Sequence, residues 1–154
     1  MKTMFWRRWL SVLLIGAGGA GPVAAEQTVR SDPWVLHYMT MNTTELTPEV
    51  ARAYGVRRSK ARGLLMLNLQ HQDQPVTSVD HRSEGVIRNL IGQTLSDPPR
   101  RVEQGGAIYS LVEFRYSHLE TLRFDYTVYP QPDSTEPTVP VRLQFNQQFF
   151  TPGR

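Results

Sequence analysis

Residues 122–129 read Leu-Arg-Phe-Asp-Tyr-Thr-Val-Tyr, with apolar and polar side chains in alternation. A period of two places every second side chain on the same face of a sheet, so this stretch predicts a strand with one buried face. Residues 139–149 alternate in the same way and predict a second strand. The stretch between them carries turn-forming residues, namely Pro130, Pro132, Asp133, Pro137 and Pro140. We therefore expect an antiparallel pair joined by a loop.

The same pattern predicts strands over residues 34–41, 63–69 and 107–116, and one or two shorter strands over residues 75–89. The 63–69 stretch is apolar on both faces, which is typical of a strand covered on both sides. Asn68 lies within this stretch. It must then have a hydrogen-bond partner, because buried polar groups are almost always paired.

One short helix interrupts the strands. Thr47 is suited to cap its first turn, Pro48 suits the first helical position, and Gly55 suits the position that ends a helix. A helix of about two turns is too short to be stable alone in water. Val50 and Tyr54 lie four residues apart and share one face, so we expect them to pack the helix onto a sheet.

Together the strands and the helix predict an all-β fold, an antiparallel β-sandwich of about six to eight strands with one short helix. The chain has 154 residues, and neither a repeat nor a low-complexity block divides it. We therefore expect a single domain over residues 26–154, which is long enough to bury a core.

Residues 1–25 have the pattern of a signal peptide. Lys2, Arg7 and Arg8 precede a segment of apolar and small residues at positions 10–21. Val23-Ala24-Ala25 then resembles a cleavage site. The apolar run is too short to cross a hydrocarbon core. We expect cleavage after Ala25, a mature chain that begins at Glu26, and a location in the periplasm with no transmembrane segment after signal removal.

Composition excludes two classes of function. The sequence contains no cysteine, which rules out thiol chemistry and disulfides. Three of its 17 lysines and arginines lie in residues 1–25, so 14 remain in the mature chain against 14 acidic residues. This balance gives no basis for nucleic-acid binding driven by counterion release.

A positively charged segment follows the predicted helix and has two interpretations. Its candidate binding residues are Arg57, Arg58, Ser59, Lys60 and Arg62. These cations could offset the negative end of the helix dipole, or pair with a carboxylate such as Glu103, and both roles are structural. They could instead capture an anionic partner. The structural interpretation is favoured, because the turn after Gly55 leads directly into the most apolar strand.

A second candidate site consists of His71, Asp73, Asp80 and His81, which a hairpin at Gln74-Pro75 could bring together. Imidazole and carboxylate groups can bind a metal ion or transfer protons. None of the four histidines forms a His-x-x-x-His pair, and Ser59 and Ser83 lie outside known nucleophile motifs. The sequence therefore predicts no cofactor and leaves these four residues as metal or acid-base candidates.

Residues 46–60, Leu-Thr-Pro-Glu-Val-Ala-Arg-Ala-Tyr-Gly-Val-Arg-Arg-Ser-Lys, resemble a family of small exported proteobacterial proteins, the domain of unknown function 4426. Further matches lie at residues 64–68, 89–93, 102–103, 107–109 and 145–149. The resemblance covers nearly the whole mature chain. It implies a periplasmic, immunoglobulin-like β domain, and it implies no activity.

Three hypotheses for function follow from the sequence. The leading one is a non-catalytic module that binds a protein or another component of the cell envelope. The first alternative is a metal-dependent or acid-base hydrolase that uses His71, Asp73, Asp80 and His81. The second alternative is a secretion or assembly accessory that pairs with its partner through a strand edge.

Overall fold

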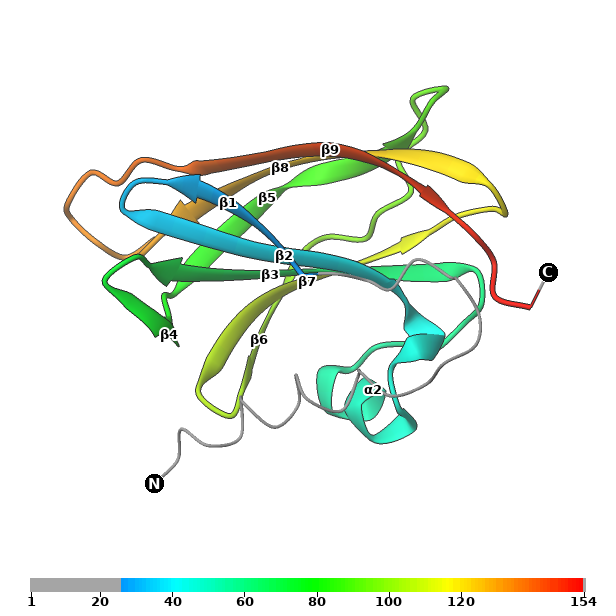
Figure 1. Ribbon diagram of the computed structural model, residues 1–154, viewed down its shortest axis with the longest axis horizontal. Coiled ribbons are helices and arrows are strands. Elements are labelled where there is room, and N and C mark those ends of the chain that lie inside the picture. The colour runs from blue at the N-terminus through cyan, green and yellow to red at the C-terminus, as the bar shows by residue number, and fades with distance from the viewer. Residues whose placement is uncertain (1–25, 154) are drawn as a thin grey trace.

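The strands form two antiparallel sheets in the computed structural model, which describes residues 26–153 (Figure 1). The larger sheet has the order β1-β2-β3-β7-β6, and β4 also pairs with β3. Its strands are β1 (Gln27–Ser31), β2 (Trp34–Asn42), β3 (Arg62–His71), β4 (Gln74–Ser78), β6 (Arg100–Gln104) and β7 (Ala107–Arg115). The smaller sheet has the order β5-β8-β9, with β5 (His81–Asn89), β8 (Glu120–Pro130) and β9 (Val141–Phe149). The predicted signal peptide lies outside the described residues.

This arrangement confirms the all-β sandwich, including the antiparallel pairing of β8 with β9. Residues 26–153 hold nine strands, however, and the expectation of six to eight was too low. The strands not predicted from the sequence are β1 and β6, which lie at the two edges of the larger sheet and whose side chains are mostly exposed. A strand that buries few side chains needs no apolar alternation, so it leaves no pattern to find.

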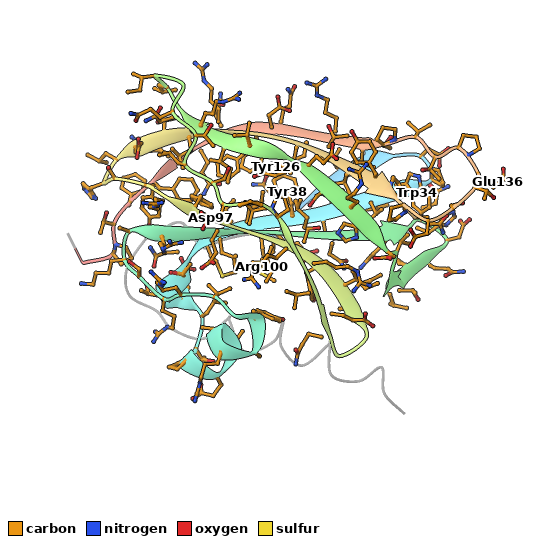
Figure 2. The ribbon with its side chains drawn as sticks, turned by 180° about the vertical axis from the view of Figure 1, so that it is seen from behind. Trp34, Tyr38, Asp97, Arg100, Tyr126 and Glu136 are labelled. Carbon is orange, nitrogen blue, oxygen red and sulfur yellow. The ribbon has the colours of Figure 1, made fainter. Side chains whose placement is uncertain are left out.

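Apolar and polar side chains alternate along the strands, and the apolar ones form a core between the two sheets. Tyr126 and Tyr38 also lie there (Figure 2). Phe114 of β7 packs edge-on against Phe124 of β8, with ring centroids 5.4 Å apart. Phe124 in turn stacks on Phe145 of β9 at 4.3 Å. Aromatic contacts of this kind add to the stabilisation from apolar burial.

Strand β3 is buried on both faces, as its composition predicted. Leu65, Leu67 and Leu69 enter the core between the sheets, while Leu64 packs on the opposite face. The amide nitrogen of Asn68 donates to Ser78 Oγ at 2.6 Å and to the carbonyl of Ile108 at 2.8 Å. The buried amide therefore has the partners that its position demanded.

The helix α2 (Pro48–Tyr54) forms as predicted. Thr47 Oγ1 accepts a hydrogen bond from the backbone of Val50, and Gly55 ends the helix in the left-handed conformation at φ 64°. A turn of 3-10 helix, η1 (Thr43–Glu45), precedes it. The helix covers the outer face of the larger sheet and packs into a second apolar cluster, of Leu46, Ala51, Val56, Leu64 and Leu111, with Val50 and Tyr54 at its margin. No helix within residues 26–153 is long and apolar enough to cross a membrane.

The chain passes from the larger to the smaller sheet between β4 and β5. The backbone N–H of Val79 donates to the carbonyl of Leu69 at 2.7 Å, which holds the crossing segment against β3. Two residues later, His81 begins β5 of the smaller sheet, and it lies beside the larger sheet. This crossing creates the seam at which the candidate site lies.

Candidate functional site

A pocket of about 300 Å³ opens at the seam where β5 begins, next to β6 and β7. We call it the seam pocket, and its lining consists of Asp80, His81, Arg82, Ser83, Pro99, Arg101, Ser110, Pro132 and Asp133. Both sheets and the loop after β8 contribute to it. A pocket of this volume can hold a small molecule.

His81 is the most deeply buried titratable group of the seam pocket, with 3% of its surface exposed. Its ring nitrogen Nδ1 lies 2.9 Å from the carbonyl oxygen of Val79. A carbonyl can only accept, so Nδ1 carries the proton and Nε2 of the neutral ring is an acceptor. Burial lowers the pKa of His81, and this outweighs the opposing effects of the Val79 and Leu67 carbonyls and of the Asp80 carboxylate. The imidazole is therefore neutral at ordinary pH.

Two buried polar atoms of this pocket's lining residues have no protein partner. They are Nε2 of His81 and Oγ of Ser83. The two residues are separated by one position on β5, so their side chains lie on the same face of the strand. Buried polar groups without partners are unusual and costly, and at a pocket they indicate a place for a bound molecule. Since the two atoms do not bond to each other, they do not form the contact that a nucleophile and its base require.

An ion-pair network forms the rim of the seam pocket. Arg101 Nε donates to Asp80 Oδ1 at 2.8 Å, and Arg101 also pairs with Glu103 at 3.3 Å. The hydrogen bond from Arg101 holds the pKa of Asp80 below its usual range. The backbone N–H of His81 donates to the same Asp80 oxygen at 3.1 Å. The network thus joins the start of β5 to β6 and fixes the pocket between the sheets.

The four predicted histidine and aspartate residues separate into two pairs. Asp80 and His81 line the seam pocket, whereas His71 lines a different pocket of about 190 Å³, and its Nδ1 lies 3.7 Å from Asp73. In the part of the chain that the structure describes, no three His, Asp or Glu side chains are placed to hold a metal ion. The hydrolase hypothesis based on all four residues therefore lacks a common centre.

The cationic segment after α2 is held mainly by its backbone. The N–H of Arg57 donates to Glu113 Oε1 at 3.0 Å, and the N–H of Ser59 donates to Thr43 Oγ1 at 2.8 Å. The carbonyl of Lys60 accepts from the amide of Asn42 at 2.9 Å. These bonds explain why the turn into β3 is ordered without requiring the cations.

The side chains of this segment differ in what they contact. Arg57 and Lys60 are exposed, Arg58 donates to the carbonyl of Thr44 at 3.1 Å, and Arg62 pairs with Asp97 at 3.4 Å. Glu103, one of the carboxylates considered as a partner for Arg57 or Arg58, pairs with Arg101 instead, and the carboxylate that Arg57 contacts, through its backbone N–H, is Glu113.

Besides Arg52 of the last turn, Arg100 places a cation at the end of the helix, on the side of the sheet that carries α2 (Figure 2). Its guanidinium donates to the carbonyls of Tyr54 at 3.1 Å and Gly55 at 3.2 Å. Arg100 is 46 positions from Tyr54 in the sequence, so no local pattern predicts this contact.

The sequence identified Asp80 and His81 of the seam pocket but missed Ser83 and Arg101. Neither missed residue lies in a spacing pattern that is typical of a binding site. Ser83 shares a strand face with His81, and a correct strand assignment could have revealed this. Arg101 lies on β6 and is placed at the pocket by the pairing of β6 with β7, which the sequence does not specify locally.

Comparison with known proteins places the chain in a family. The model of the family described as Domain of unknown function (DUF4426) matches residues 28–152. The chain belongs to the DUF4426 family. It is similar to a crystal structure of a DUF4426 family protein from Pseudomonas aeruginosa PAO1, with a TM-score of 0.68 and 32% identity over 82% of this chain and 95% of that chain. No curated protein matches this DUF4426 chain.

Two structures of FetP from uropathogenic Escherichia coli strain F11 share the fold of this DUF4426 chain. A copper-bound variant of FetP has a TM-score of 0.56 and 10% identity over 82% of this chain and 95% of that chain. FetP as isolated after expression in the periplasm of Escherichia coli has a TM-score of 0.52 and 9% identity over 86% and 98%. At these identities the similarity shows the fold alone.

Proposed function

We propose that this DUF4426 chain is a periplasmic, non-catalytic binding module whose ligand site is the seam pocket. The observation that carries the proposal is the pair of buried polar atoms, His81 Nε2 and Ser83 Oγ, that have no protein partner. A ligand that hydrogen-bonds to both atoms removes a cost that the free protein bears.

The chemistry of the pocket selects a small polar ligand with hydrogen-bond donors. Nε2 of the neutral His81 ring accepts a hydrogen bond, and the Ser83 hydroxyl accepts or donates. Asp80 and Asp133 add acceptor oxygens at the rim, while Arg101 is flanked by the carboxylates of Asp80 and Glu103. Amines and hydroxyl-bearing molecules have the donors that such a lining favours.

A periplasmic location is supported by the sequence pattern of residues 1–25, with cleavage after Ala25. It is also supported by the fold shared with FetP, a protein that was expressed in the periplasm. A module in that compartment meets small polar solutes as well as envelope components. The pairing of a partner through a strand edge, proposed from the sequence, stays a prediction.

The test uses the mature protein with isotope-labelled histidine rings and the low-molecular-mass fraction of a periplasmic extract from cells that carry the protein naturally. We expect this fraction to shift the His81 Nε2 resonance and to raise the melting temperature, since a ligand of the native state stabilises it. The Ser83→Val variant should lose both responses. Ser117→Val, which alters an exposed serine in the turn before β8, should keep them. An unchanged Nε2 resonance in the native protein, or an equal response from Ser83→Val, contradicts the proposal.

A further inference from the structure

Four of the six large apolar side chains exposed within residues 26–153 lie at one end of the sandwich. Leu90 and Ile91 are 58% and 81% exposed in the turn after β5, which projects beyond the sheets (Figure 1). Leu119 precedes β8 and Phe150 follows β9, and both are about half exposed. We call these four residues the apolar end. The other two, Val76 and Val139, lie in β4 and in the loop before β9.

Hydrogen bonds join the segments of the apolar end into one surface. The amide of Asn89 donates to Glu120 Oε1 at 3.2 Å, which ties the projecting turn to the start of β8. Gln148 Nε2 donates to the carbonyl of Leu119 at 2.9 Å, which ties that turn to the end of β9. The four apolar side chains therefore stand on neighbouring segments of one rigid frame.

The projecting turn does not need its apolar side chains in order to fold. The N–H of Gly92 donates to the carbonyl of Asn89 at 3.0 Å, and the side-chain oxygen of Asn89 accepts from the N–H of Gln93 at 2.9 Å. Gly92 adopts φ 86°, which glycine tolerates without strain. Turn tips are ordinarily polar, so a fixed turn that presents Leu90 and Ile91 to solvent points to an interaction.

Two arginines lie beside the apolar end on the outer face of the smaller sheet. Arg88 and Arg123 are direct cross-strand neighbours, and both are exposed. Other arginines of this sheet have carboxylate partners, Arg82 with Glu84 and Arg142 with Asp125. None of the ion pairs among residues 26–153 includes Arg88 or Arg123. Like charges directly opposite each other are unfavourable, and an anion between them relieves the repulsion.

We propose that the apolar end docks on an anionic phospholipid surface. Leu90 and Ile91 enter the boundary between headgroups and acyl chains, and Arg88 and Arg123 contact lipid phosphates. A projecting apolar tip offers no groove to a folded partner, whereas a fluid lipid surface closes around it. Apolar insertion combined with cation attraction is the usual basis of peripheral binding to anionic membranes.

This docking leaves the seam pocket open. His81 begins β5 and Asn89 ends it, so the pocket and the projecting turn lie at opposite ends of one strand. The strand separates them by about 25 Å, at a rise of roughly 3.3 Å per residue. A protein bound to a membrane by its apolar end still presents the seam pocket to the surrounding solution.

Cosedimentation of the mature protein with vesicles tests the proposal. The probes are vesicles of phosphatidylcholine alone and vesicles of phosphatidylcholine with phosphatidylglycerol. We expect binding to the second kind, reduced by added salt because exposed charges are screened. The double substitution Leu90→Ser with Ile91→Ser should weaken binding about tenfold or more, since it removes the inserted apolar area. Arg88→Gln with Arg123→Gln should abolish the preference for phosphatidylglycerol.

The matched control is Val76→Ser with Val139→Ser, which removes two similarly exposed aliphatic side chains remote from the apolar end. This variant should bind vesicles as the native protein does. Three outcomes overturn the proposal: no binding of the native protein to phosphatidylglycerol vesicles, equal binding by the Leu90/Ile91 variant, or an equal loss in the control. Self-association of the native protein that disappears in the Leu90/Ile91 variant, without vesicle binding, would assign the apolar end to a second copy of the chain instead.

Discussion

His81 links the seam pocket to the pH dependence of folding. Burial lowers its pKa from the ordinary value of 6.5, so the folded protein binds this proton less readily than the unfolded chain. Stability is therefore complete above the unfolded pKa and falls as the pH drops below about 6.5, by at most about 1.4 kcal/mol per pH unit. The hydrogen bond from Arg101 lowers the pKa of Asp80, so the stability that this carboxylate contributes is lost only at lower pH, when the carboxylate becomes protonated.

The corresponding prediction concerns His81→Gln. Denaturant unfolding of the native protein between pH 7 and pH 5 should show a decline in stability that the variant lacks, because glutamine does not titrate. His118→Gln, at a partly exposed histidine in the turn before β8, should retain the decline. Parallel declines in the native protein and His81→Gln would show that another group titrates on unfolding.

Arg57 and Arg58 are adjacent but should respond differently to substitution. The Arg58 guanidinium donates to the carbonyl of Thr44, whereas Arg57 binds Glu113 through its backbone N–H, which alanine retains. We expect Arg58→Ala to cost about 1 kcal/mol, the typical net value of one hydrogen bond. Arg57→Ala should change stability by less than about 0.5 kcal/mol. Thermal melts of both variants measure the difference, and a greater loss for Arg57→Ala would refute this assignment.

Local chemistry made some residues predictable. Thr47 and Gly55 have the roles that capping preferences assign, and Asn68 has the partners that a buried amide requires. Arg100 and Arg101 act on groups more than twenty positions away, through the position of β6 in the sheet. No local pattern encodes such contacts, so Arg57 and its neighbours were predicted to offset the helix end instead.

At the scale of elements, the close approach of β3 to β7 depends on a glycine. Gly63 lies opposite Phe114, and a Cβ atom at Gly63 would lie 2.2 Å from the Phe114 ring. The ring is fully buried and packs against the rings of Phe124 and Phe149. Gly63→Ala should therefore destabilise the protein by about 3 kcal/mol, as overpacking does. Chemical denaturation measures this, and a cost below 1 kcal/mol would mean that the core yields more readily than its packing implies.

The success of the strand predictions depended on how much each strand buries. Apolar and polar side chains alternate in β8 and β9 because one face of each strand lies in the core. β3 is mostly apolar because both of its faces are covered. β1 and β6 bury little, so hydrophobic periodicity could not reveal them. Arg101 lies on β6, which was not predicted. The ion pair of Arg101 with Asp80 at the rim of the seam pocket therefore could not be predicted either.

At the scale of the whole molecule, the signal-peptide pattern predicts where the mature chain begins. We expect osmotic shock to release a protein that begins at Glu26, because residues 1–25 have the order of charge, apolar run and small residues that signal peptidase recognises. Intact-mass measurement of the released protein tests this. A mass that includes residues 1–25 would show a retained segment and would contradict cleavage after Ala25.

The sandwich as a whole places a neutral, buried imidazole and a buried hydroxyl at a seam that the two sheets do not fill. The most direct test is a high-resolution crystal structure of the protein purified from its native periplasm without denaturation or exchange. We predict electron density for a small polar molecule within hydrogen-bond distance of both His81 Nε2 and Ser83 Oγ. A seam pocket that holds only water, or a Ser83 hydroxyl bonded to the protein itself, would contradict the account.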